Sequence, residues 1–169
     1  MSAPACTIRF GQTDDVPTIF SLIKGLAEYE RLSDDVVGTE DLLREHLFGE
    51  RPYAEVILAE AGGRAVGFAL FFHNYSTFLT RPGVYLEDLF VLPDERGRGY
   101  GKALLAALGR LAVERGCGRL EWSVLDWNEP SIKFYRSLGA VGQDEWTVNR
   151  VTGEALTSLA SMAPPIQAG

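Results

Sequence analysis

A glycine-rich segment, Arg96–Gly101 (RGRGYG), constrains the fold of this chain more than any other feature of its sequence. It lies between a strand-like apolar run, Tyr85–Leu92, and a run with helical spacing of apolar residues, Lys102–Arg115. Three glycines within five positions let the main chain approach a ligand without intervening side chains. The helix that follows directs unpaired N–H groups and the positive end of its dipole toward the loop, and two arginines add charge. The segment therefore predicts an anion site, with a pyrophosphate as its natural ligand.

The composition fits one soluble domain, which we expect over residues 5–163 of the 169. A net charge of −7 without a basic stripe argues against a nucleic-acid binder. No apolar run reaches the length of about 18 residues that a membrane span needs, and no signal-peptide pattern is visible. The two cysteines have no Cys or His at metal-ligand spacing, so we expect a cytoplasmic protein without a metal site.

The hydrophobic pattern predicts an α/β domain with a mixed sheet and helices on both faces. Two strand-like runs flank Gly62 and Gly63, which predicts a β-hairpin there. Gly109 interrupts the helix after the glycine-rich segment, which we interpret as a site of close packing on the sheet. The expected strands are Thr7–Phe10, Glu55–Glu60, Ala65–Phe72, Val84–Leu92, Leu120–Val124, Ala140–Gly142 and Trp146–Val151, and the expected helices begin near Asp14, Thr39, Lys102 and Asn128.

Two motifs, in this order along the chain, resemble those of the GNAT superfamily of acetyl-CoA-dependent N-acetyltransferases. Arg96, Gly99 and Gly101 match its pyrophosphate signature, Gln/Arg-x-x-Gly-x-Gly/Ala. Asn128 and Tyr135, on the last expected helix, match a second conserved pair of that superfamily. A Rossmann interpretation fits less well, because the loop follows a hairpin in mid-chain rather than the first strand of a βαβ unit. The resemblance implies the single-domain GNAT fold, with a mixed, mostly antiparallel sheet.

Further segments are similar to the diamine (polyamine) and thialysine acetyltransferase branch of this superfamily. They are Leu26–Glu30, Tyr85–Val91, Leu125–Asn128, Glu145–Trp146 and Gly153–Ala155. The similarity covers nearly the whole chain and keeps the order of the motifs. It implies a homodimer in which the C-terminal strand region lies near the partner.

The resemblance also implies how acetyl-CoA is held. Main-chain groups of Leu89–Val91 would pair with the pantetheine amides as an added strand does. Asn128 would contact the cofactor, and Tyr135 would stand near its sulfur. The segment that would hold the pyrophosphate consists of Arg96, Gly97, Arg98, Gly99, Tyr100, Gly101 and Lys102.

Acetyl transfer to an amine requires a proton acceptor, because an alkylamine with a pKa near 10.4 arrives as an ammonium ion. Glu87 is our candidate, since it lies in mid-strand in an apolar run, where burial would make its carboxylate a stronger base. The alternative is a carboxylate on a solvated strand face. Asp88 would point to the other face and hold the substrate or a neighbouring strand. Tyr135 would donate a proton to the departing thiolate, and neither cysteine suits an acyl-enzyme nucleophile.

The amine itself is less constrained. The segment from His73 to Arg81 carries no carboxylate and ends in a cation, which disfavours polyamines and suits a small amine that carries a carboxylate. Tyr29, Glu30, Trp127 and Glu145 could line its pocket, or could be ordinary surface or packing residues. We expect an N-acetyltransferase that acts on a thialysine-like or lysine-like amino acid or on a diamine or polyamine by direct transfer in a ternary complex. The alternatives are a protein N-terminal or lysine acetyltransferase and a non-catalytic acyl-CoA-binding module.

Overall fold

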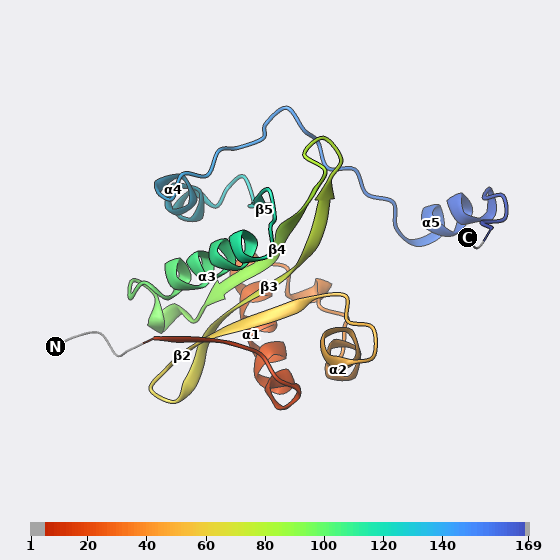
Figure 1. The fold of residues 1–169 in the computed structure, drawn as a ribbon. Coiled ribbons are helices and arrows are strands. Elements are labelled where there is room, and N and C mark those ends of the chain that lie inside the picture. The colour runs from red at the N-terminus through yellow and green to blue at the C-terminus, as the bar shows by residue number, and fades with distance from the viewer. Residues whose placement is uncertain (1–5, 168–169) are drawn as a thin grey trace. The chain divides into compact units, whose positions relative to one another are not determined.

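The computed structural model describes residues 6–167 of the chain (Figure 1). These residues divide between Ser123 and Val124 into two units, each of which is described by itself. The first unit contains the sheet, and the second contains the last two helices. The expected domain boundary at residue 5 lies outside the described residues, and the extent 5–163 stays a prediction.

The sheet of the first unit has five strands in the order β1-β2-β3-β4-β5. The first three pairings are antiparallel, and β5 joins β4 in parallel. A mixed, mostly antiparallel sheet is therefore confirmed. The strands are β1 (Thr7–Phe10), β2 (Glu55–Ala61), β3 (Arg64–Ser76), β4 (Arg81–Val91) and β5 (Leu120–Trp122).

Helices cover both faces of this sheet (Figure 1). On one face lie α1 (Val16–Glu30) and α2 (Glu40–Phe48), which follow the amphipathic patterns that the sequence predicts. The Thr39 hydroxyl caps α2 by accepting a hydrogen bond from the Leu42 N–H at 3.2 Å. On the other face lies α3 (Tyr100–Glu114), which contacts β1 to β5. The expected α/β class with helices on both faces is confirmed.

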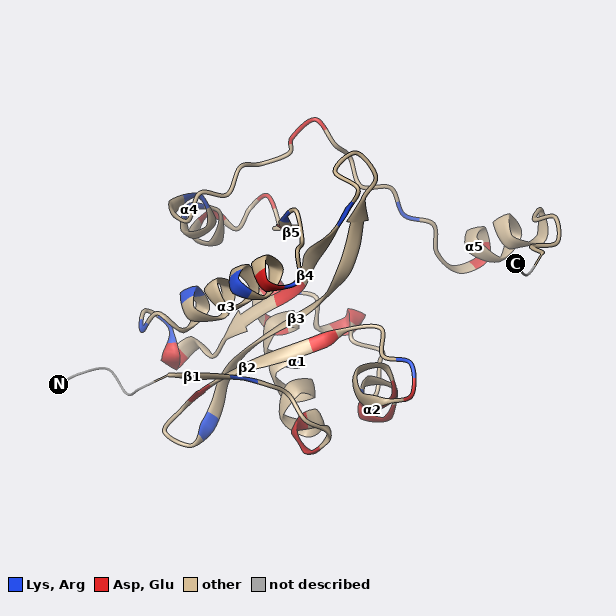
Figure 2. Cartoon of the chain, in the orientation of Figure 1, with Lys and Arg blue, Asp and Glu red and all other residues tan. Residues whose placement is uncertain are grey.

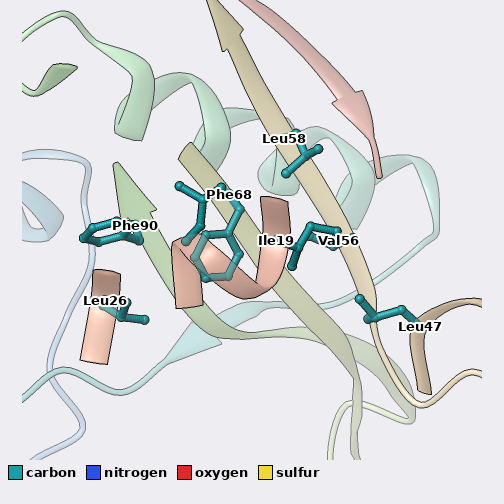
Figure 3. Packing of buried hydrophobic residues seen from close by; sticks show 8 residues of the cluster. Ile19, Leu26, Leu47, Val56, Leu58, Phe68 and Phe90 are labelled. Carbon is teal, nitrogen blue, oxygen red and sulfur yellow. The ribbon is translucent and has the colours of Figure 1, made fainter. Parts of the chain in front are cut away.

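The core between the sheet and α1 uses alternate residues of each strand, since successive strand residues point to opposite faces (Figure 3). Side chains of β2, β3 and β4 there meet the apolar stripe of α1. The members are Ile19, Leu22, Leu26, Leu47, Val56, Leu58, Phe68 and Phe90. The intervening residues, such as Ile57, face α3, whose Leu104 and Leu108 are fully buried.

The packing role that we expected for Gly109 is wrong. A Cβ atom built at Gly109 meets no atom within 4 Å, so this glycine is not needed for a close approach of α3 to the sheet. It is a weak point of the helix, because glycine in a helix interior costs about 1 kcal/mol relative to alanine.

The second unit contains α4 (Glu129–Ser137) and α5 (Gly153–Ser161). The strands expected at residues 140–142 and 146–151 are wrong, because residues 138–152 form neither helix nor strand. Val141, Trp146 and Val148 of this segment are each 79% exposed, so nothing in their own unit covers the alternating apolar side chains. A strand needs a neighbouring strand to accept its hydrogen bonds, and the segment has none within the described residues.

Two searches of residues 6–167 bear on membrane and metal binding. None of the helices there is both long enough and apolar enough to cross a bilayer. In the same residues, no three histidine, cysteine or acidic side chains gather in an arrangement that could hold a metal ion.

Candidate active site

The glycine-rich loop connects β4 to α3 through the short 3-10 helix Pro93–Glu95. Gly97 and Gly99 adopt left-handed backbone conformations, with φ of 77° and 87°, that other residues rarely take. A Cβ atom built on either glycine meets nothing within 4 Å, so open space lies beside the loop. Because the first N–H groups of α3 have no acceptor within the helix, they face this space as donors. The loop therefore fits a pyrophosphate, as the sequence predicts.

The two arginines of the loop point to different partners. The Arg96 Nε–H donates to the Val91 carbonyl oxygen at 3.0 Å, and its guanidinium lies 4.5 Å from the centre of the Tyr29 ring. Arg96 thus ties the loop to β4 and to the C-terminal end of α1. The Arg98 guanidinium instead pairs with the Glu95 carboxylate at 3.0 Å. Figure 2 shows the acidic residues that follow β4 and the basic loop that comes after them, before α3.

The edge of β4 that faces β5 is paired over only part of its length. β5 pairs with Val84, Tyr85 and Leu86, and within the described residues no strand continues this pairing toward Val91. Main-chain groups of Leu89–Val91 therefore have no strand partner on this edge within the first unit. Their pairing with the pantetheine, as an added strand would pair, stays a prediction.

A β-bulge interrupts β4 beside this open edge. Leu70 of β3 pairs with Asp88 and Phe71 pairs with Leu86, so Glu87 is an extra residue without an opposite partner. The bulge reverses the alternation: Asp88 shares the α1 face with Phe90, whereas Leu86 lies on the opposite face with Phe71. Sequence alternation alone would have placed residues 86 and 88 on one face.

Because of the bulge, the burial of the two carboxylates differs from the burial that we expected from the sequence. Glu87 is exposed, whereas Asp88 is half-buried near Glu30 at the end of α1. Burial, and to a lesser extent the negative charges of Glu87 and Glu30, raise the pKa of Asp88 to about 6. Burial also raises the pKa of Glu30. The structure thus brings Glu30 and Asp88 together, with Tyr29 next to Glu30 in the chain. A desolvated carboxylate of this kind is typical of functional sites.

The remaining predicted site residues belong to the second unit. Asn128 is 5% exposed and caps α4, since its Oδ1 accepts a hydrogen bond from the Ser131 N–H at 3.4 Å. Tyr135 is half-buried on the same helix, with its ring centre 5.3 Å from that of Phe134. Trp127 is 52% exposed, and Glu145 lies in the exposed segment before α5. The capping role confirms the local structure that the sequence predicts for Asn128; the roles of all four in binding stay predictions.

Sequence reasoning missed two charged residues beside the glycine loop. Glu95 is 9% exposed, and its carboxylate binds both Arg98 of the loop and Arg64 at the start of β3. The three-residue spacing of Glu95 and Arg98 was visible in the sequence. Arg64 was not identifiable, because its approach depends on the register of β3 against β4.

An apolar pocket of 360 Å³ lies elsewhere, between α3 and the β1–β2 edge of the sheet. Ile8, Ile57, Ala103 and Ala107 are among its lining residues. It contains none of the predicted site residues, so it is separate from the glycine loop and the carboxylates.

Several known proteins are similar to this chain in sequence. Residues 22–140 match the model of the acetyltransferase (GNAT) family. The thialysine N-epsilon-acetyltransferase of Bos taurus is 38% identical, and the alignment covers 90% of this chain and 96% of that protein. The L-ornithine N5-acetyltransferase NATA1 of Arabidopsis thaliana is 34% identical, and the alignment covers 90% of this chain and 86% of that protein.

Solved structures share the fold. An integron cassette protein from the mobile metagenome of V. cholerae is 28% identical and superposes with a TM-score of 0.77, covering 95% of this chain and 98% of its own. A ribosomal-protein-alanine N-acetyltransferase from Brucella melitensis superposes with a TM-score of 0.69 at 24% identity, over 88% of this chain and 100% of its own. The second likeness bears on the fold alone.

Proposed function

The chain belongs to the acetyltransferase (GNAT) family, and from this membership we propose that it transfers an acetyl group from acetyl-CoA to a primary amine of a small diamino acid. Thialysine and ornithine are the first candidates, because relatives that match 90% of this chain carry those names. The observation that supports the proposal most is the arrangement along β4. A desolvated carboxylate lies at the bulge, an open main-chain edge follows, and the anion loop lies just beyond.

Acetyl-CoA, when bound, supplies the acetyl group as an activated thioester. We propose that the main-chain N–H groups from Gly97 to Lys102 hold its pyrophosphate and that the open edge at Leu89–Val91 holds the pantetheine arm. A main-chain N–H of this edge would polarise the thioester carbonyl, as an oxyanion hole does. Asn128 and Tyr135 complete the proposed set, with Tyr135 as the proton donor to the thiolate and transfer occurring directly in a ternary complex.

For the amine, we propose a pocket that includes Tyr29, Glu30 and Asp88 of the first unit. We propose separately that Trp127 and Glu145 are substrate-binding residues. The adjoining carboxylates attract an ammonium group, since opposite charge stabilises it most where water is partly excluded.

Proton acceptance requires an ionised carboxylate, and we propose that it belongs to the Glu87–Asp88 pair. Because the pKa of Asp88 is about 6, kcat/KM should rise with pH through an apparent pKa near 6. In Asp88→Asn, this rise of kcat/KM near pH 6 should be absent. In Glu87→Gln, kcat/KM should be lower but should still rise near pH 6. If the rise near pH 6 were instead absent in Glu87→Gln and present in Asp88→Asn, the proton acceptor would be Glu87.

The Asp88→Asn variant also has a readout apart from activity. The raised pKa means that the folded protein holds the Asp88 proton more tightly than the unfolded chain, so Asp88 favours folding at low pH and loses this contribution as pH rises through about 6. The variant should therefore melt at a higher temperature than the wild type at pH 7.5 and at a similar temperature at pH 4. A lower melting temperature at pH 7.5 would contradict the burial of an ionised carboxylate.

The proposed substrate class is tested by measuring acetyl-CoA consumption with thialysine, ornithine, lysine, spermidine and a short peptide with a free N-terminus. We expect kcat/KM to be highest for one of the diamino acids. A preference for the peptide would support a protein acetyltransferase instead, and tight coenzyme A binding without turnover of any amine would support a binding module.

We also propose that the protein is a homodimer, as the branch resemblance implies. The exposed apolar side chains of the second unit, such as Val141, Trp146 and Val148, support this proposal, because such side chains are commonly covered by a partner. Light scattering at micromolar concentration should give twice the chain mass of 18.6 kDa; a mass of one chain would overturn the proposal.

A further inference from the structure

A single carboxylate beside the glycine loop holds two guanidinium groups. Glu95 ends the short helix between β4 and the loop, and only 9% of its surface is exposed. Its Oε1 lies 2.5 Å from Arg64 Nη2, and its Oε2 lies 3.0 Å from Arg98 Nη1. Arg64, at the start of β3, is therefore brought to Glu95, which lies 31 positions later in the chain.

This cluster keeps a surplus of positive charge that faces solvent. Two guanidiniums against one carboxylate leave a net charge of +1. The side chains of Arg64 and Arg98 are 59% and 47% exposed, whereas that of Glu95 is 11% exposed. Each guanidinium carries five N–H donors, so the contact with Glu95 leaves further donors on both arginines for an outside acceptor.

The other arginine of the loop is directed elsewhere. Arg96 donates to the Val91 carbonyl and stacks on Tyr29, so it helps to fix the loop rather than to extend its positive surface. The cluster of Arg64 and Arg98 is thus a distinct basic site beside the main-chain donors of Gly97 to Lys102.

We propose that Arg64 and Arg98, positioned by Glu95, form a second phosphate site that takes the ribose 3′-phosphate of coenzyme A. The inference rests on the proposed function, in which the loop itself takes the pyrophosphate. Coenzyme A carries this further phosphate as a monoester, whose charge near pH 7 is about −1.5 to −2. A phosphate monoester matches the planar fork of arginine, which binds such oxygens through paired N–H donors.

The test compares the binding of coenzyme A and of 3′-dephospho-coenzyme A by isothermal titration calorimetry. Hydrogen bonds between a guanidinium and a phosphate are stronger than neutral ones, but both arginines here are partly exposed to water. We therefore expect the wild type to bind coenzyme A about tenfold more tightly than 3′-dephospho-coenzyme A. Arg64→Gln should weaken coenzyme A binding and leave the dephospho form unchanged, so that the ratio falls to about threefold or less.

Arg110→Gln is the matched control, because it removes the same charge from an exposed position on α3, ten residues and about 15 Å beyond Tyr100. It should keep the wild-type ratio. Equal affinities of the wild type for both ligands, or an equal loss of both in Arg64→Gln, would overturn the second phosphate site. Failure of the wild type to bind either ligand would instead overturn the proposed function.

Glu95→Gln separates positioning from simple attraction. Removing the carboxylate makes the site more positive by one charge, so attraction alone predicts tighter coenzyme A binding. If Glu95 positions the two arginines, the affinity for coenzyme A relative to 3′-dephospho-coenzyme A should fall in Glu95→Gln, although the site is more positive. A higher ratio in a variant that keeps the wild-type melting curve would contradict positioning by Glu95.

Discussion

Gly99→Asp should weaken acetyl-CoA binding by at least about 100-fold, because two unfavourable changes coincide at one residue. The φ of Gly99 is 87°, which a residue with a Cβ atom adopts only with strain. Gly99 also immediately precedes α3, so the new carboxylate would take up the main-chain donors and repel the pyrophosphate. Titration calorimetry with acetyl-CoA measures the loss directly.

Two further variants separate charge from strain. Gly99→Asn has nearly the same size without the charge and tolerates positive φ comparatively well, so it should lose no more than about tenfold in affinity. Gly116→Asp makes the same exchange at another positive-φ glycine, at the far end of α3, and should bind acetyl-CoA normally. If Gly99→Asp kept near-normal affinity, the loop would not be the pyrophosphate site.

Tyr135→Phe should lower kcat by about 100-fold and leave the affinity for acetyl-CoA nearly unchanged. The substitution removes one hydroxyl, while the ring and its contact with Phe134 remain. If the phenol donates its proton only as the thiolate departs, its loss raises the barrier to transfer without weakening binding. Steady-state kinetics combined with calorimetry distinguish the two effects.

Tyr53→Phe is the matched control, since Tyr53 is 74% exposed, lies before β2 and is not one of the predicted site residues. It should keep the wild-type kcat. A wild-type kcat in Tyr135→Phe would remove the proton-donor assignment, and a change confined to KM would recast Tyr135 as a binding residue.

The sequence predicted the glycine loop well because its signals are local. Glycines at positions 97 and 99 and a following amphipathic run suffice to indicate a positive-φ turn at a helix N-terminus, and the structure has both. Helices α1 and α2 could be predicted equally well, since the apolar spacing of both, and the Thr39 cap of α2, lie within each segment. For the same reason Asn128 was recognised as a cap from the Asn-Glu-Pro sequence alone.

What the sequence could not predict depends on pairing between distant segments. The bulge at Glu87 depends on the register of β4 against β3. Because of it, Asp88 is half-buried where the sequence predicted burial of Glu87. The Arg64–Glu95 contact likewise requires the β2–β3 hairpin to reach the loop. The strands expected after Gly139 failed for a related reason: alternation in a sequence shows that a segment could pair, and not that a partner edge is present.

The short pairing of β5 with β4 has a consequence for the protein between catalytic cycles. Exposed main-chain donors and acceptors along a strand are a template for another strand, and an unoccupied edge at Leu89–Val91 can recruit an extended segment of a neighbouring molecule. If pantetheine occupies the edge, the donor substrate also shields it, and by mass action it stabilises the folded chain. The concentration of acetyl-CoA would then govern how long the protein remains soluble as well as how fast it works.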